Sequence, residues 1–566
     1  MRYTPAMRVF SVALILLTCV GCVTRPLATY EELAAAVAAG EAVDIEDLRR
    51  AFAAAPDFAE RIDALGSLEQ QAMQLVDEEP LRLGPLGAAI LDRYQGSIAG
   101  HYALVRFYEF VEREEAALEH RQWVARIVAG MEGDGTREEP YVVLSAAEAN
   151  AYLVATGRQP VGSIYQTSDA FPFVLAVTAK PPEGPMQNVF FDLGAAYASV
   201  RDSVASEAPG REFRPGALIG LLARRDDPAA QVYIGGFLFS EDRLDEAIDW
   251  LSAASRRGNL VANLMLARVH LARAQRQPEG PDREEALELV MQNYVHAVAV
   301  GSDEAMYQLA ELYLAEYYGP DESALAIPLL EQAADLDNID ATLLLAQIYV
   351  AGHGVEADYD LSEAYFLRAA GLESEAAKIQ YARFLMSETV GKEFTDQAFD
   401  WLRELADDLD PCRGETLTRR PCPAAEARLL LGDMHARGVH VKASHRRARN
   451  WFKSAVKASP ENARIINEVA WWLTVTQIER LRDERYALAI MERMMNKDDV
   501  ARRNPAYLDT WAAAYAANGD FGRAVALQEE ALKEANDAEM TEVIDELERH
   551  LSSFQAGETI TDPTVP

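Results

Sequence analysis

From about residue 228 onward, the chain repeats a pattern of small residues that is typical of stacked helix pairs. In each copy a small residue, usually after an apolar one, is followed three positions later by an apolar residue, an aromatic residue or a histidine. The eight small landmarks, 32 to 50 residues apart, are Gly235, Ala267, Ala310, Ala346, Ala382, Gly432, Ala470 and Ala512. Small residues at fixed points let paired helices approach closely, so the pattern predicts a mainly α fold, with an α-solenoid over residues 228–552.

A second alanine follows each landmark and indicates the class of repeat. These alanines are Ala247, Ala286, Ala324, Ala364, Ala398, Ala448, Ala487 and Ala524. The interval between the two small residues is 12 in the first and last repeats and 14 to 19 in the repeats between them. The interval of 12 is similar to that of the tetratricopeptide repeat.

The longer intervals resemble the Sel1-like variant, whose repeat has a longer turn containing Gly-x-Gly-Val. One copy of that turn is the run Ala351-Gly-His-Gly-Val355, and a second is the run Ala436-Arg-Gly-Val439. The resemblance implies helical hairpins that bind other proteins, and it leaves the specific task open because fold does not fix function.

The first residues read as a cleavable signal. Arg2 and Arg8 form a positively charged region before an apolar run of 13 residues, Val9 to Gly21. This run is too short to span a bilayer comfortably as a helix. We therefore expect residues 1–21 to be removed, which takes two positive charges from the mature chain.

The end of this run resembles the lipobox of bacterial lipoproteins, because small Gly21 directly precedes Cys22. The resemblance implies that Cys22 is acylated and becomes the first residue, with residues 22–27 as a lipidated tether. Val23 stands where an Asp would favour inner-membrane retention in that family, so the resemblance implies that the protein is located at the outer membrane. The alternative is an ordinary secretory signal with a chance cysteine.

Two further cysteines form a pair. Cys412 and Cys422 lie in a segment, Asp410 to Pro423, with three prolines and a glycine that cannot continue a helix. An even count fits an oxidising compartment, so the sequence predicts a disulfide-closed loop between two helices. The alternative, two free thiols or half of a metal site, lacks a neighbouring cysteine or histidine cluster.

The remaining regions differ in the secondary structure that their sequences predict. Residues 28–134 carry alanine-rich faces at the helical period and are expected to be helical. Residues 135–200 predict a small α+β module, with strands near 141–144, 173–178 and 188–192 and a helix opened by the capping-box pair Ser145 and Glu148. Residues 201–227 are expected to connect this module to the repeats, and residues 553–566 to form a disordered tail.

Charge and motifs argue against nucleic-acid binding and give no support for catalysis. Ninety acidic against 54 basic residues leave a formal charge of −36, which repels phosphate backbones. The sequence has no zinc-protease, nucleophile-elbow, phosphate-loop or dinucleotide motif, so we expect no catalytic residue, cofactor or metal. The nearest grouping, His435, His440 and His445, has spacings of five across a turn, which do not align three imidazoles on one helical face.

By the repeat resemblance, two rows of residues face the concave side of the solenoid. One row follows each small landmark directly, and the other lies three positions before it. The candidate partner-binding residues from these rows are Tyr307, Glu311, Gln347, Arg383, Asp433 and Trp471. The alternative is that these polar rows are solvated surface.

Together these features predict an outer-membrane lipoprotein whose periplasmic solenoid scaffolds an envelope complex by binding other proteins, with the lipid anchor as its only membrane contact. The architecture is broadly similar to repeat lipoproteins of alginate and other exopolysaccharide export systems. The alternative is a cell-wall or polysaccharide-processing enzyme with its activity in residues 135–200, which would need paired carboxylates. The acids there are Glu138, Glu139, Glu148, Asp169, Glu183 and Asp192, and no spacing among them marks a catalytic pair.

Overall fold

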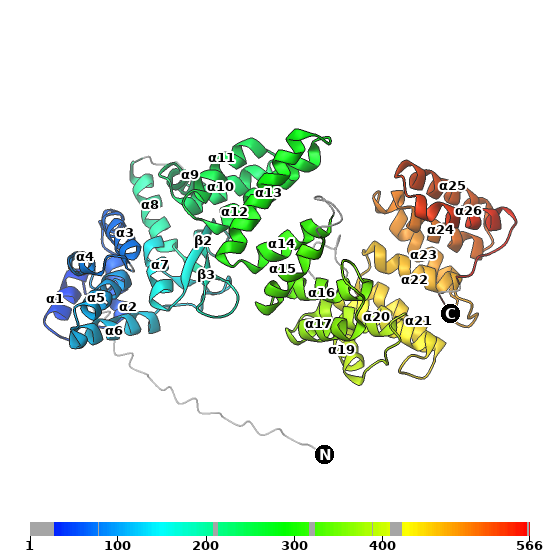
Figure 1. Ribbon diagram of the computed structural model, residues 1–566, viewed down its shortest axis with the longest axis horizontal. Helices are drawn as coiled ribbons and strands as arrows, with labels where there is room; N and C mark the ends of the chain where they lie inside the picture. The colour runs from blue at the N-terminus through cyan, green and yellow to red at the C-terminus, as the bar shows by residue number, and fades with distance from the viewer. Residues whose placement is uncertain are drawn as a thin grey trace, which may run out of the picture. The chain divides into compact units, whose positions relative to one another are not determined.

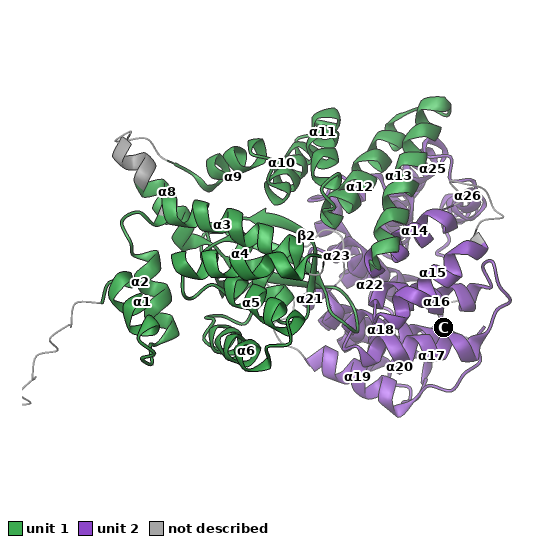
Figure 2. Ribbon diagram, turned by 60° about the vertical axis from the view of Figure 1, so that its left-hand side comes forward, with its two compact units in different colours: residues 1–302 green, residues 303–566 purple. Residues whose placement is uncertain are grey.

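The computed structural model describes residues 28–76, 78–207, 213–315, 323–387, 389–407, 422–562 and 565. The chain divides into two compact units, residues 1–302 and residues 303–566 (Figure 2). Helices dominate both units and one small sheet lies in the first (Figure 1), which confirms the predicted fold class. No helix among the described residues combines the length and hydropathy needed to cross a membrane.

In the described part of the first unit, the first six helices lie within residues 28–134, as expected. They are α1 (Tyr30–Ala38), α2 (Ile45–Ala53), α3 (Phe58–Leu75), α4 (Pro80–Arg93), α5 (Ile98–Phe110) and α6 (Glu114–Ala129). The first is opened by a capping box, in which Thr29 accepts from the Glu32 backbone and the Glu32 carboxylate accepts from the Thr29 backbone. Phe52 and Tyr94 stack at 4.2 Å between ring centroids inside this helical region.

The sheet has the order β1-β4-β3-β2, with β1 parallel to β4 and the other pairs antiparallel. Its strands are β1 (Tyr141–Val142), β2 (Gln159–Gln166), β3 (Val174–Lys180) and β4 (Gln187–Asp192), and α7 (Ala146–Ala155) lies between the first two in sequence. Three strands and the helix opened by Ser145 match the predicted module.

The strand β2 was not predicted, and it contains Pro160 and Gly162, two residue types that strand interiors disfavour. A proline is tolerated there because β2 is an edge strand, and the ladder to β3 has an irregularity between these two residues. A Cβ on Gly162 would lie 2.9 Å from the Val261 backbone nitrogen, so this glycine permits close approach of a repeat helix. β2 pairs with β3 and packs against α12, and the local sequence encodes neither contact.

The first two repeat hairpins belong to the same unit as the sheet. The helices that follow the sheet are α8 (Gly194–Glu207), α9 (Pro215–Arg224), α10 (Pro228–Ser240), α11 (Leu244–Ser255), α12 (Leu260–Arg276) and α13 (Pro281–Val300). Asn259, the N-cap of α12, donates to the Ser163 carbonyl at 2.9 Å, and the Tyr165 hydroxyl donates to Asp227 ahead of α10 at 3.1 Å. The α+β module therefore covers the first hairpins through its edge strand, and the compact unit does not end at residue 227.

The second unit is an array of helical hairpins (Figure 1). Its helices are α14 (Asp303–Leu314), α15 (Ser323–Asp335), α16 (Ile339–Ala351), α17 (Tyr359–Gly371), α18 (Glu375–Met386), α19 (Asp396–Asp407), α20 (Pro423–Arg437), α21 (His445–Ala458), α22 (Ala463–Val475), α23 (Glu484–Met495), α24 (Pro505–Ala517), α25 (Phe521–Asp537) and α26 (Thr541–Gln555). A short 3-10 turn, η2 (Ala501–Arg503), precedes α24.

All eight predicted landmarks lie on the first helix of a hairpin and are buried. A Cβ added to Gly432 would lie 2.4 Å from a ring carbon of Phe452, which explains the glycine at this crossing. Two of the second small residues were placed wrongly, because Ala324 and Ala364 are exposed. The buried small residues at those crossings are Ala326 and Ser362.

The predicted disordered tail is wrong for its described part. Residues 553–555 continue α26, and the Asp562 backbone donates to the carbonyl of Val475 at 3.1 Å. Val565 is buried in the core formed by the last hairpins. The end of the chain therefore returns to α22.

Candidate functional site

The second unit contains a groove of about 540 Å³ on the first helices of successive hairpins. Most of its lining comes from α16, α18, α20 and α22, with one residue from α17 and two from the loop after α18. The lining residues are Gln347, Val350, Phe366, Gln380, Arg383, Phe384, Ser387, Val390, Glu426 and Arg464. Two of the predicted partner-binding residues, Gln347 and Arg383, are thus brought together.

A neutral polar pair bridges the first two helices of the groove. The Gln347 side chain on α16 donates from Nε2 to Oε1 of Gln380 on α18 at 2.7 Å. Gln347 follows the buried landmark Ala346, so packing of the alanine turns the glutamine toward the open face.

A series of ion pairs continues across the next helices. Arg383 on α18 donates to Glu426 on α20 at 3.0 Å, and Arg464 on α22 donates to the other oxygen of Glu426 at 2.8 Å. Arg464 also reaches Glu468 one turn along its own helix at 3.2 Å. One carboxylate thus joins three successive hairpins, while the side chains of Arg383 and Arg464 remain 35% and 41% exposed.

Asp433 lies close to this chain of charges. It accepts from Arg437 at 2.6 Å, and burial raises its pKa although the positive charges of Arg437 and Arg383 oppose that effect. Burial likewise raises the pKa of Glu468. The predicted residue Asp433 therefore belongs to the charged surroundings of Arg383, although it does not line the groove itself.

The floor of the groove is apolar. The rings of Phe366 and Phe384 lie 5.1 Å apart, and Val350 and Val390 complete the floor beside them. An apolar floor beside a few oriented polar groups is the composition of sites that bind a polypeptide segment or another organic ligand.

The predicted residues Tyr307 and Glu311 do not line this groove. Both lie on α14, where the Tyr307 hydroxyl donates to Glu311 at 2.8 Å. Burial and the neighbouring carboxylate raise the pKa of Tyr307, so it is a neutral donor at physiological pH. They form a local pair on the first-helix face of their own hairpin.

Trp471 was predicted to face an open groove, and the structure corrects that expectation. Its indole Nε1 donates to Asp562 of the C-terminal segment at 2.9 Å, and its ring lies 6.0 Å from that of His550. This part of the first-helix face is therefore already occupied by the chain itself.

The row three positions before each landmark was also partly misplaced. Leu343, Ile379 and Leu429 from that row are buried between helices. The open face instead carries residues two and six positions before the landmark, such as Gln380, Glu426 and Arg464. The missed signal was the pair Arg464 and Glu468, whose spacing of four residues places both side chains on one face of α22.

The predicted lipid and disulfide sites lie mostly outside the described residues. Cys22 and Cys412 are not described by the structure. Cys422 is buried directly ahead of α20 and packs in the core of the last hairpins. The Cys412–Cys422 bond remains a prediction.

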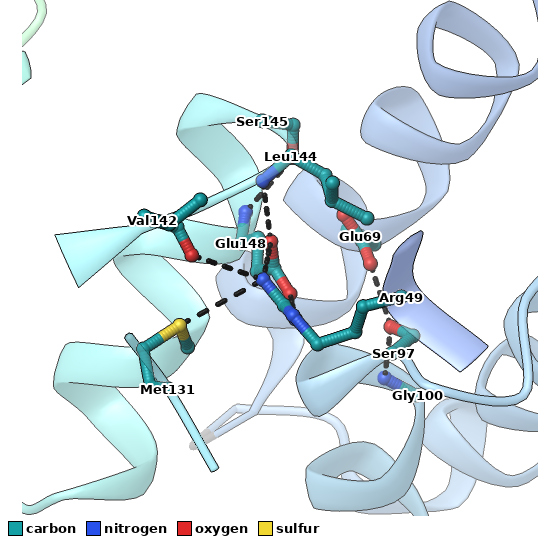
Figure 3. A network of polar contacts seen from close by, with 9 residues as sticks. All are labelled: Arg49, Glu69, Ser97, Gly100, Met131, Val142, Leu144, Ser145 and Glu148. Atoms are coloured by element: carbon teal, nitrogen blue, oxygen red, sulfur yellow. Dashed lines mark hydrogen bonds and ion pairs between the residues drawn. The ribbon is translucent and has the colours of Figure 1, made fainter. Parts of the chain in front are cut away.

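The carboxylates of the α+β module do not assemble into a catalytic pair. Glu148 on α7 forms a buried ion pair with Arg49 on α2, and its Oε2 accepts from the Leu144 backbone at 2.6 Å (Figure 3). Arg49 also donates to the Val142 carbonyl at 3.1 Å. Asp192 accepts from the Gly194 backbone at 2.8 Å, and the other four acids of the module are exposed. The buried ion pair of Arg49 and Glu148 therefore joins α2, α7 and β1.

A second buried carboxylate lies beside this ion pair. Glu69 on α3 is 2% exposed and accepts from the Ser97 hydroxyl at 2.6 Å, while its other oxygen has no hydrogen-bond partner (Figure 3). Burial raises the pKa of Glu69 to about 8, so the carboxyl is mostly protonated at neutral pH. Among the described residues, no three histidine, cysteine, aspartate or glutamate side chains are grouped as metal ligands.

Comparison with known proteins identifies the class of repeat. The Sel1 repeat model matches residues 231–259, 303–338, 339–374 and 425–459, which include both predicted glycine turns. The Sel1-repeat-containing protein YjcO of Escherichia coli is 30% identical over 169 residues, which are 29% of this chain and 70% of that protein.

Solved structures include two similar repeat proteins. One is a protective antigen of uropathogenic Escherichia coli strains that displays an SLR fold, with a TM-score of 0.37 and 15% identity over 60% of this chain and 69% of that one. The other is a Sel1 repeat protein from Oxalobacter formigenes, with a TM-score of 0.35 and 17% identity over 48% of this chain and 98% of that one. On the matched repeats and the relationship to YjcO, the chain belongs to the Sel1-repeat family.

Proposed function

We propose that this protein is an outer-membrane-anchored periplasmic scaffold that binds other envelope proteins in the groove between α16 and α22. Sel1-repeat proteins are protein–protein interaction scaffolds, which supports the general role. The observation that carries the proposal is the joint presence, in one groove of about 540 Å³, of an apolar floor and partly exposed arginines.

The groove favours a protein partner with an apolar side chain flanked by a carboxylate. Phe366, Phe384 and Val390 offer the apolar surface, and the guanidinium groups of Arg383 and Arg464 retain donors beyond their shared contact with Glu426. The formal charge of −36 disfavours direct capture of an anionic polysaccharide. In exopolysaccharide export, the pathway that we propose, the chain would therefore hold proteins of the export complex.

Paired measurements test the groove. Arg383→Ala should weaken capture of partners in crosslinked pull-downs from cell envelopes by more than any loss of melting temperature explains, because the side chain is 35% exposed and Arg464 remains as a partner for Glu426. Arginines at interfaces often cost about 2 kcal/mol or more on truncation. A parallel loss of stability and capture, or unchanged capture by the folded variant, would refute the groove.

The location at the outer membrane is a separate part of the proposal. Its support is the signal-like start of the sequence and the lipobox-like Gly21-Cys22 pair. Palmitate labelling and membrane fractionation should show an acylated outer-membrane protein, and Cys22→Ser should lose the label and leave the membrane. Unlabelled wild-type protein would exclude the anchor without affecting the groove.

An oxidising compartment also supports the predicted Cys412–Cys422 bond. Non-reducing mass mapping should find the two cysteines joined, with the short loop stabilising the fold by roughly 2 to 3 kcal/mol in the chain-entropy model. Two alkylatable thiols in protein purified directly from the periplasm would exclude the bond.

A further inference from the structure

The chain turns back on itself after its last helix. Gly557 has a φ of 75°, in the left-handed region that favours glycine. The backbone nitrogens of Gly557 and Glu558 donate to the carbonyls of Phe554 and Ser553 at 3.1 and 2.9 Å, which ends α26. We call residues 556–562 and 565 the C-terminal segment.

This segment is recognised at the last turn of α22 through one acidic residue. The Asp562 backbone donates to the Val475 carbonyl at 3.1 Å, and its carboxylate accepts from the Trp471 indole at 2.9 Å. The last carbonyls of a helix have no partner within the helix, so an incoming N–H satisfies one of them. Backbone and side chain of the same residue are thus bound at two points.

Apolar contacts flank this polar recognition. Ile560, two residues before Asp562, packs against the core of the last hairpins, and Val565 is buried in it. The segment therefore combines an aliphatic residue and a carboxylate two positions apart, and both side chains contact the solenoid.

The surroundings of Trp471 hold its indole in place. The His550 ring lies 6.0 Å from the Trp471 ring, and His550 Nδ1 lies 2.9 Å from an Asp509 oxygen. Gln528 donates to the same oxygen of Asp509 at 2.7 Å. These contacts come from α24, α25 and α26, so the site is built by the last hairpin and the closing helix.

We propose that the last turn of α22 is a binding site for an extended peptide with an aliphatic residue two positions before an aspartate, and that the C-terminal segment is its intramolecular occupant. A partner segment of the same chemistry displaces it and extends the bound surface beyond the groove at Arg383. This second step rests on the proposed scaffold function, whereas the site itself is independent of it.

A peptide assay tests the site with this protein alone. The probe is a fluorescent peptide with the sequence of residues 557–566, and binding is followed by anisotropy. In the wild-type chain the tethered segment competes at high effective concentration. Full-length Asp562→Ala and a chain ending at Gly557 should therefore bind the probe at least about ten-fold more tightly than wild type, with circular dichroism confirming that both remain folded.

Two matched changes identify the recognised groups. Trp471→Phe in the Asp562→Ala chain keeps an aromatic ring but removes the N–H donor, and it should weaken probe binding about ten-fold. A probe in which Asp562 is alanine should lose affinity to a similar extent.

The outcomes separate this inference from the scaffold proposal. If folded Asp562→Ala protein does not gain affinity, or if the alanine probe binds as well as the original, the peptide site is refuted while envelope capture at Arg383 is untouched. If the probe binds as expected but Arg383→Ala leaves envelope capture intact, the site stands and the groove proposal fails.

Discussion

The Ser362 hydroxyl on α17 donates a hydrogen bond of 2.8 Å to the Ala346 carbonyl on α16, at the point where the two helices cross. Both residues are fully buried. The interval from 346 to 362 is 16 residues, and the buried pairs Ala310–Ala326, Ala382–Ala398 and Gly432–Ala448 have the same interval. The four hairpins from α14 to α21 therefore share one crossing geometry, which sets the register of the groove.

Substitution at this crossing should destabilise the second unit. Ala346→Trp places an indole where a small side chain is fully buried, and overpacking typically costs about 1 to 3 kcal/mol or more. Gln347→Ala, one residue along on the open face, should cost under about 0.5 kcal/mol. Thermal melts of the two variants check the register, and equal shifts would show that it is wrong.

The buried ion pair in the first unit gives a second prediction. Arg49→Met leaves the Glu148 carboxylate buried without its cation, which should cost about 3 to 5 kcal/mol. Adding Glu148→Gln should recover much of this loss, because glutamine is neutral and its oxygen can still accept from the Leu144 backbone. Urea unfolding of the full chain measures both, and an Arg49→Met chain as stable as wild type would contradict the structural role of the pair.

Glu69 should make stability depend on pH. Burial raises its pKa to about 8 from an ordinary value near 4.5, so the folded chain binds this proton more tightly than the unfolded chain. The stability it contributes is full below about pH 4.5 and is lost as the pH rises toward 8.

The matched variant isolates this effect. Glu69→Gln keeps an acceptor for Ser97 without the charge. From pH 5 to pH 8, the unfolding free energy of the variant should rise relative to wild type by at least about 1 kcal/mol. A constant difference across this range would mean that Glu69 titrates as it does in the unfolded chain.

The sequence predicted the repeats well because their geometry is local. A buried small residue such as Ala382 and an exposed neighbour such as Arg383 are fixed by helical periodicity and close helix packing. At one misplaced second landmark, Ala364, the buried small residue is Ser362, which is as small as alanine in this role and also provides a hydrogen bond. At the other, Ala324 and Ala326 are both alanines, so residue type does not distinguish the buried one.

Periodicity in the sequence could not predict contacts between segments that are far apart in the chain. Gly162 in β2 lies against α12, which is nearly a hundred residues later in the chain. The hydrogen bond from Trp471 to Asp562 joins residues 91 positions apart. Both features differ from what the local sequence indicates. Gly162, a residue type that strands disfavour, lies in β2, and Trp471, which was predicted to face an open groove, is covered by the C-terminal segment.

Photo-crosslinking in living cells tests the central claim, that the groove holds a protein partner, most directly. A photoreactive phenylalanine analogue replaces Gln347 on the groove helix α16, and a matched one replaces Leu367, an exposed residue of the second helix α17. We predict a discrete crosslinked envelope protein from position 347, reduced by Arg383→Ala in the same chain, and little or none from position 367. Equal capture from both positions, or no capture from position 347, would contradict the account.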